Sequence, residues 1–135
     1  GMNVKENQIK TYALDRMSDL RLNGGVYIKN EIFDPMNYFK HSFGITTPDT
    51  AVETIILRFS KNQIPYIKSL PIHPTQQVIE ESAQELTISI KVIPSYELYE
   101  YILGKMPEVK VISPSSIANQ VKKILKDSLK HALKK

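Results

Sequence analysis

Residues 52–112 read VETIILRFSKNQIPYIKSLPIHPTQQVIEESAQELTISIKVIPSYELYEYILGKMPEVKVI and carry the strongest structural pattern in the chain. Alternating apolar and polar residues, bounded by turn residues, predict four strands, over residues 52–59, 75–80, 86–93 and 109–112. Two short helices are predicted between them, within residues 61–70 and from 95 to 103. This β-α-β-β-α-β order predicts a ferredoxin-like α+β fold, with the helices on one face of a four-stranded antiparallel sheet. The first and third strands are expected at the centre of the sheet.

Individual residues mark the ends of these two helices. Proline is poor in a helix interior, so the first helix is expected to begin near Pro65. Ser95 is a favourable N-cap for the second helix, and Gly104 is expected to stop it.

A last helix is predicted from Ser113-Pro114 to about residue 133. Its apolar side chains recur at helical spacing and form one stripe, made of Ile117, Val121, Ile124, Leu125, Ser128, Leu129 and Ala132. Such an amphipathic helix lies on a core or on a partner subunit. Lysines cover its other faces, and we interpret them as a solvated basic surface that also suits the negative end of the helix dipole.

An N-terminal arm of one strand and one helix is predicted before the core. Alternation over residues 9–22 predicts a strand with Asp15-Arg16 near its middle. Asp34-Pro35 predicts an N-cap and first helical position, and the apolar residues that follow extend the helix to Phe43, where Gly44 is expected to cap it.

The chain is therefore expected to divide into three parts. Residues 1–8 are interpreted as a disordered start in which Gly1, before Met2, is the remnant of a cleaved tag. Residues 9–50 form the arm, and residues 51–135 form the ferredoxin-like domain with its C-terminal helix.

The net charge of +4 belongs to the end of the chain. Residues 114–135 hold one acid, Asp127, and six lysines: Lys122, Lys123, Lys126, Lys130, Lys134 and Lys135. The other residues include 12 basic and 13 acidic ones, so the body is not a uniformly basic nucleic-acid-binding domain. The absence of cysteine, of a long apolar run and of a signal-peptide pattern predicts a cytoplasmic protein without membrane contact.

Five stretches, in order, resemble the WYL-domain family of bacterial transcriptional regulators. Residues 11–17, TYALDRM, are similar to the last strand of the WYL domain, an Sm-like β-barrel, and residues 33–45 to the segment after it. Three motifs resemble the C-terminal extension known as WCX: His73-Pro74-Thr75-Gln76, Tyr101-Ile102-Leu103-Gly104 and Val111-Ile112-Ser113-Pro114. The likeness covers roughly residues 9–130, but the Trp-Tyr-Leu tripeptide that names the family is absent.

The resemblance implies a regulator whose WYL region senses a ligand, often a nucleotide or nucleic acid. It implies an extension that helps the protein form a homodimer, and DNA contact through a further domain. One residue is carried over: Arg16 matches the arginine of the final barrel strand, a position implicated in ligand contact. Because an edge strand without neighbours tends to pair with another chain, residues 9–22 are expected to pair across the dimer.

A candidate ligand-binding surface lies on the polar face of the predicted sheet. In the strands over 52–59 and 86–93, one row of side chains is apolar and faces the helices. The other row presents Thr54, Arg58, Thr87, Ser89 and Lys91. Two cations among hydroxyls suit a phosphate or a carboxylate, although a solvated sheet face has the same pattern.

Catalysis has no support in the sequence, and neither a cofactor nor a metal is expected. The three histidines His41, His73 and His131 have no metal-ligand spacing, and His73 is interpreted as a packing or turn residue. We therefore predict a non-enzymatic sensing and dimerisation module of a transcriptional regulator. The alternative is a stand-alone small-molecule-binding domain of the ACT type, which shares the β-α-β-β-α-β order. A small accessory enzyme, with turnover dependent on Arg58 or Lys91, is a third hypothesis.

Overall fold

The chain folds into two compact units, residues 1–32 and 33–135, each described here by itself. The structure is a computed structural model that describes residues 1–3, 5–22, 24–26 and 33–133. Lys134 and Lys135, which belong to the predicted basic surface, lie outside the described residues.

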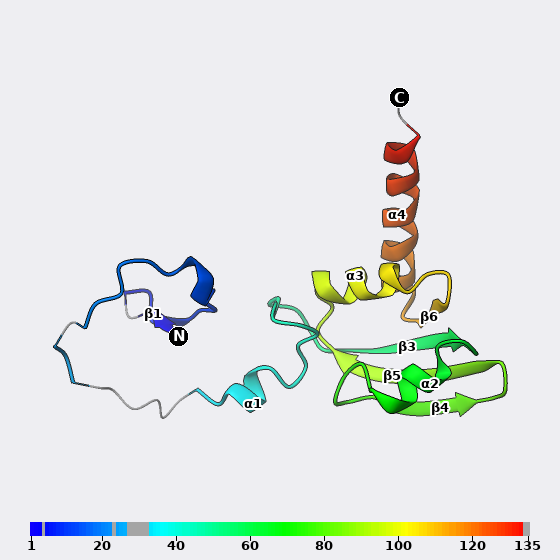
Figure 1. The fold of residues 1–135 in the computed structure, drawn as a ribbon, viewed down its shortest axis with the longest axis horizontal. Helices are drawn as coiled ribbons and strands as arrows, with labels where there is room; N and C mark the ends of the chain where they lie inside the picture. The colour runs from blue at the N-terminus through cyan, green and yellow to red at the C-terminus, as the bar shows by residue number, and fades with distance from the viewer. Residues whose placement is uncertain (4, 23, 27–32, 134–135) are drawn as a thin grey trace. The chain divides into compact units, whose positions relative to one another are not determined.

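The second unit is a mixed α/β domain, shown in Figure 1. Its strands are β3 (Glu53–Ser60), β4 (Gln77–Glu81), β5 (Glu85–Val92) and β6 (Val109–Ser113). Its helices are α1 (Pro35–Tyr38), α2 (Ile64–Ser69), α3 (Tyr96–Gly104) and α4 (Ser115–Ala132). From residue 52 onward, every predicted strand and helix is confirmed within one or two residues.

All three strand pairs of the four-stranded sheet are antiparallel, in the order β4-β5-β3-β6. The central pair aligns Thr54 with Lys91 and Arg58 with Thr87. The first and third strands of the sequence, β3 and β5, are therefore the central ones, as predicted.

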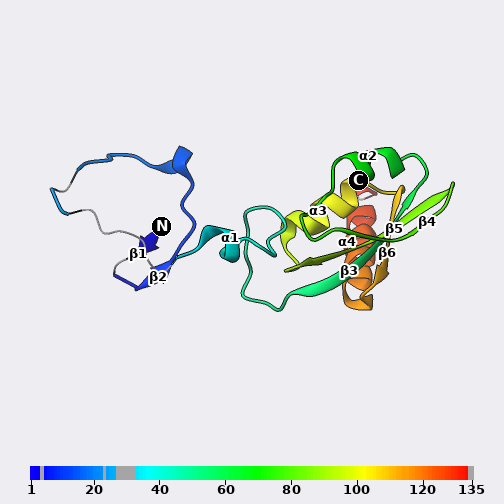
Figure 2. The same cartoon turned by 90° about the horizontal axis from the view of Figure 1, so that it is seen from below.

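The core lies on one face of this sheet, where α2 and α3 lie (Figure 2). The apolar rows of β3 and β5 are fully buried, namely Ile55, Leu57, Phe59, Leu86, Ile88, Ile90 and Val92. They pack in one cluster with Ile67 of α2, with Leu98 and Ile102 of α3, and with Ile117 and Val121 of α4. Each such side chain stabilises the fold by about 1.5–3 kcal/mol through apolar burial.

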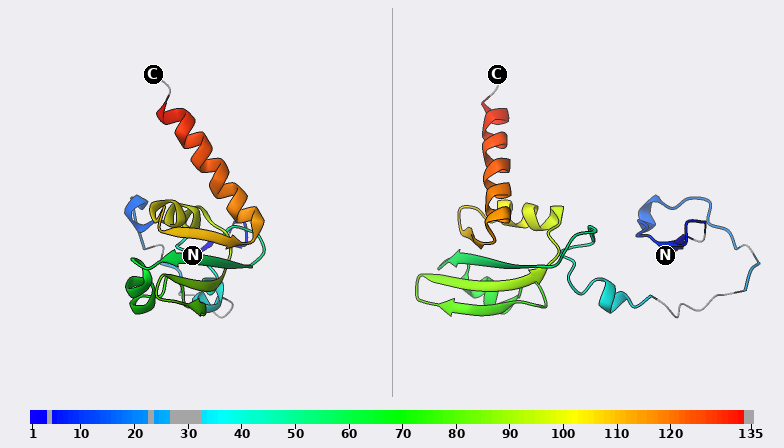
Figure 3. Two further views of the ribbon diagram at one scale, coloured as in Figure 1. Left: turned by 90° about the vertical axis from the view of Figure 1, so that its right-hand side faces the viewer. Right: turned by 180° about the vertical axis from the view of Figure 1, so that it is seen from behind.

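The right-hand view of Figure 3 shows the opposite face of the sheet, which no helix among the described residues of the second unit covers. The β3 and β5 side chains on this face are Thr54, Ile56, Arg58, Ser60, Glu85, Thr87, Ser89 and Lys91. Antiparallel sheets tolerate this arrangement because only one face needs to be apolar.

The helix in the segment before β3 is shorter than predicted. Asp34 caps α1 by accepting a hydrogen bond from the Met36 amide at 3.0 Å, as expected. The helix ends at Tyr38, however, and the prediction that it extends to Phe43 is wrong. The reason is a tertiary contact: after Tyr38 the chain runs beside the end of β5, where Ser42 forms a parallel bridge with Ile93.

This entry segment, residues 39–47, is built into the domain core. Phe43 is 9% exposed and packs edge-on against Tyr101, with ring centroids 5.5 Å apart. The Ser95 hydroxyl donates to the Phe43 carbonyl at 2.9 Å, so the N-cap of α3 also holds the entry segment.

The first unit does not contain the predicted strand over residues 9–22. Its strands β1 (Met2–Asn3) and β2 (Gln8–Ile9) pair with each other, and Leu14–Arg16 forms the short 3₁₀ helix η1. A strand needs a neighbour for its ladder of hydrogen bonds, and within the described residues β1 pairs only with β2. Pairing of residues 9–22 across a dimer stays a prediction.

Candidate functional site

The polar face of the sheet carries five of the six predicted site residues. Across the central strand pair, Thr54 lies opposite Lys91, and Arg58 lies opposite Thr87. Ser89 lies between these pairs on β5. The structure therefore brings the five residues onto one surface, as the alternation predicts.

Arg58 is engaged by its neighbours on β5. Its Nε donates to the Thr87 hydroxyl at 3.3 Å, and one terminal nitrogen lies 3.6 Å from a Glu85 carboxylate oxygen. Thr87 is buried. The positive charge of Arg58 is partly compensated here, so this end of the face is a poor place for an anion.

Arg58 and Lys91 do not form one small site. Thr54, which pairs with Lys91, is four residues from Arg58 along β3, a separation of roughly 13 Å at about 3.3 Å per residue. One phosphate or carboxylate does not span that distance. The predicted surface therefore has two separate ends, one at Arg58 and one at Lys91.

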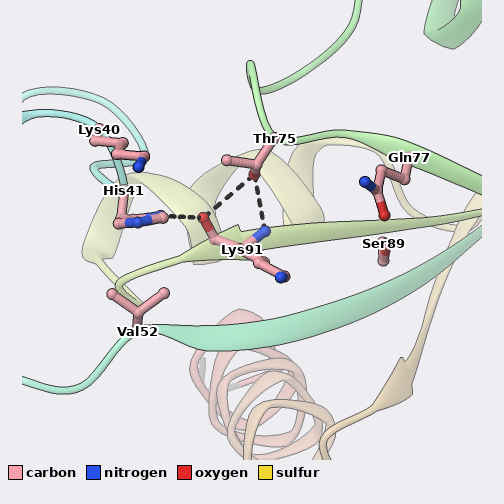
Figure 4. Close-up of a pocket in the computed structure, with 7 residues that line it drawn as sticks. All are labelled: Lys40, His41, Val52, Thr75, Gln77, Ser89 and Lys91. Atoms are coloured by element: carbon pink, nitrogen blue, oxygen red, sulfur yellow. Dashed lines mark hydrogen bonds between the residues drawn. The ribbon is translucent and has the colours of Figure 1, made fainter. Parts of the chain in front are cut away.

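The Lys91 end opens into a pocket of about 520 Å³. Seven residues line it: Lys40, His41, Val52, Thr75, Gln77, Ser89 and Lys91. Figure 4 shows Lys40 and His41 on one side, Gln77 and Ser89 on the other, and Lys91 between them. This pocket joins two of the predicted site residues, Ser89 and Lys91, to five that were not predicted.

Hydrogen bonds fix the backbone of Lys91 at the pocket wall (Figure 4). The Lys91 amide donates to the Thr75 hydroxyl at 2.9 Å. His41 Nδ1 lies 3.0 Å from the Lys91 carbonyl, and a carbonyl only accepts, so Nδ1 carries the proton. Nε2 of His41 is then the ring nitrogen that can contact a ligand.

His73 supports the pocket from inside the domain. This side chain is 5% exposed, and its Nε2 lies 3.2 Å from the Ser42 carbonyl, to which it donates. Nδ1 accepts from the Thr75 amide at 3.2 Å. Burial, followed by repulsion from His41, lowers the pKa of His73, although the Ser42 carbonyl opposes the shift. The neutral ring is the form that both hydrogen bonds require, and the predicted packing role of His73 is confirmed.

Glu97 ties the entry segment to the start of α3. Its Oε1 accepts from the Thr46 amide at 3.0 Å. Hydrogen bonds from the side chain and the backbone of Thr46 lower the pKa of Glu97 from 4.5 to about 2. The charged carboxylate is therefore the form that stabilises this junction.

The domain is expected to lose the Glu97 contribution to stability as the pH falls from about 4.5 towards 2. The folded pKa lies below the unfolded one, so the contribution is complete above pH 4.5. Its size is on the order of 1–2 kcal/mol, because solvent screens a partly exposed carboxylate. Urea unfolding at pH 7 and pH 3 checks this: Glu97→Gln is expected to flatten the pH dependence. The matched change Glu100→Gln, on the exposed side of the same helix, is expected to leave the pH dependence as it is.

Arg16 is not shown to join this surface. It lies exposed in η1 of the first unit. The strand predicted around Arg16 is not formed, since residues 14–16 form a 3₁₀ turn closed by the Met17 amide on the Leu14 carbonyl at 3.2 Å.

Two further observations limit what the described residues can do. No group of three or more histidine, aspartate or glutamate side chains among them is placed to hold a metal ion. None of their helices has the length and apolar character that crossing a bilayer requires.

Comparison with known families agrees with the architecture of the second unit. None of the curated proteins matches the chain. The model of the WCX domain matches residues 51–129, from just before β3 to near the end of α4. This match spans the sheet, both core helices and most of α4, which is more than half of the sequence, and the chain therefore belongs to the WCX domain family.

Proposed function

We propose that this chain is the non-catalytic sensing and dimerisation module of a bacterial WYL-type transcriptional regulator. The WCX match over residues 51–129 supports the regulator context, because WCX is the extension implied by the sequence resemblance. In this proposal, a separate domain of the regulator contacts DNA, and the protein acts in the cytoplasm.

The sensing part of the proposal is supported by the polar face of the sheet. It is open, and its Lys91 end holds a pocket with cationic and hydroxyl side chains. The titratable groups inside the domain serve its structure instead: His73 and Glu97 both hold the entry segment. This division of roles favours ligand binding over catalysis.

The observation that carries the dimerisation part is the apolar stripe of α4. Its first two members, Ile117 and Val121, are buried against the sheet. The same stripe then continues as the helix leaves the body (Figure 1): Leu125 is 41% exposed and Leu129 60%. Exposed leucines on such a stripe form the kind of surface that packs against another helix. We propose that the α4 of a second copy covers it.

The full chain is expected to form a dimer that Leu129→Lys dissociates. In a symmetric dimer the change acts twice, and a buried lysine replaces a buried leucine at each copy. We expect the dimer Kd to rise by at least about 100-fold. Sedimentation equilibrium over a range of concentrations measures this directly.

A matched variant tests whether the effect is specific to α4. Leu70→Lys makes the same exchange at an exposed leucine after α2 and is expected to leave the Kd within about twofold. Lysines flank the α4 stripe, so added salt is expected to strengthen the dimer by screening their repulsion. A wild-type chain that stays monomeric at about 1 mM, or equal effects of both variants, would contradict dimerisation through α4.

We also propose that the second unit has a ferredoxin-like fold. The β-α-β-β-α-β element order and the central places of β3 and β5 support it. The same observations favour the second candidate, an ACT-like domain that binds a small molecule at an edge between subunits. A dimer that forms only with a small molecule and survives Leu129→Lys would favour the ACT-like candidate.

A further inference from the structure

We infer that the pocket at the Lys91 end binds the phosphate group of a small molecule and thereby ties the entry segment to the sheet. The inference rests on the proposed sensing function and adds to it a ligand class, a location and a consequence for the chain.

The charges of the pocket favour an anion. Lys40 and Lys91 line it from two sides, and His41 lies beside Lys40. No aspartate or glutamate is among the lining residues. Two ammonium groups from different walls suit a doubly charged group, whose oxygens can meet both at once.

The polar lining completes a set of donors for phosphate oxygens. Gln77 and Ser89 face each other across neighbouring strands, since the register pairs them directly. Their side-chain N–H and O–H groups add neutral hydrogen-bond donors to the two lysines. Few, convergent polar groups of this kind orient a ligand in most small-molecule sites.

The pocket is large enough to hold an organic group in addition to the phosphate. A volume of about 520 Å³ falls in the range of sites that hold small organic molecules, roughly 300–1,000 Å³. Val52 supplies an apolar patch at its edge. We therefore assign the site to a phosphate monoester with a compact organic body.

The two walls of the pocket come from separate parts of the chain. Lys40 and His41 belong to the entry segment, whereas Thr75, Gln77, Ser89 and Lys91 belong to β5 and to β4 with the loop before it. A phosphate held by Lys40 and Lys91 would bridge these walls. Ligand binding would then hold the segment that leads back from the domain towards residue 33, which is a direct way to report occupancy to preceding parts of a regulator.

The test measures binding of two probes, inorganic phosphate and adenosine monophosphate, to the full chain. Both are expected to shift the amide NMR signals of Lys40, His41, Thr75, Gln77 and Lys91, with a Kd of about 0.1–1 mM for the nucleotide. Lys91→Ala is expected to weaken both by at least about 10-fold. Lys110→Ala removes an equal charge from the same sheet face on β6, away from the pocket, and is expected to change the Kd by less than about twofold.

A second readout follows the entry segment. Adenosine monophosphate is expected to slow hydrogen exchange at the amides of Ser42 and Ile93, whose hydrogen bonds join this segment to itself and to the end of β5. Lys40→Ala is expected to weaken binding and to remove this protection, while unchanged urea unfolding shows that the variant still folds.

Three results would overturn the inference. One is the absence of any shift with about 10 mM inorganic phosphate at low ionic strength. Another is equal weakening by Lys91→Ala and Lys110→Ala. The third is that a single-stranded oligonucleotide binds more tightly than the mononucleotide and that Lys91→Ala and Lys110→Ala each weaken its binding. This result would indicate a diffuse nucleic-acid surface. Dimerisation is measured in the same samples by sedimentation, so failure of the pocket leaves the α4 proposal standing and the reverse also holds.

Discussion

A chain that begins at residue 51, where the WCX match starts, is expected to be less stable than one that begins at residue 33 by about 4 kcal/mol. The shorter chain lacks Phe43, whose burial against Tyr101 and His73 contributes about 2–3 kcal/mol. It also lacks the Ser42 carbonyl, so the hydrogen bond from His73 Nε2, which contributes about 0.5–1.5 kcal/mol, is lost. Because small domains have only about 5–15 kcal/mol of stability, this is a large part of the total.

Urea unfolding of three chains, followed by circular dichroism, tests this expectation. Residues 1–135 and 33–135 are expected to give the same midpoint for the second unit, since residues 1–32 form a separate compact unit. The chain 51–135 is expected to unfold at a much lower urea concentration. A difference below about 1 kcal/mol between 33–135 and 51–135 would show that the entry segment is not part of the folding unit.

Gly44→Ala is expected to destabilise the second unit by about 2–3 kcal/mol. Gly44 has φ +89°, in the left-handed region that costs an L-residue about 1–2 kcal/mol. A Cβ at this position would lie 2.9 Å from Cγ and 3.0 Å from Cβ of Glu97. The Glu97 side chain would have to move, and the hydrogen bond from the Thr46 amide would be weakened with it.

Gly104→Ala is the matched control for this prediction. Gly104 is the last residue of α3, and a Cβ there would meet nothing within 4 Å. Alanine is the better helix former, so this change is expected to be neutral or to stabilise by up to about 1 kcal/mol. Thermal unfolding of both variants gives the comparison, and equal effects would refute the strain and close contact assigned to Gly44.

The sheet and its core could be predicted from residues 52–133 because their signals are local. Alternation of apolar and polar residues assigns the rows of β3 and β5 to opposite faces whatever the rest of the chain does. Ser95 marks the start of α3 through a local hydrogen bond, in which its hydroxyl accepts from the Leu98 amide and needs no distant partner. For the same reason the polar row with Arg58 and Lys91 was found in the sequence.

The candidate pocket could be predicted only in part. Ser89 and Lys91 belong to the polar row, whereas Lys40 and His41 come from some 50 residues earlier and are placed by the bridge between Ser42 and Ile93. That bridge leaves no periodic trace in the sequence. Gly44 was a signal of it, but a glycine that ends a helix and a glycine that permits a close approach look alike in a sequence.

By itself, then, the sequence determined the order of the strands and helices, the side of the sheet that is buried and the apolar stripe of α4. Each of these follows from the period of side chains along a strand or a helix. Only the tertiary structure decided that residues 9–22 form no long strand, that Arg58 pairs with Glu85 and Thr87, and that the entry segment closes the pocket beside Lys91. These features depend on which distant groups supply hydrogen bonds and charge, and backbone pairing between segments far apart in the chain is not encoded in the residues of either segment alone.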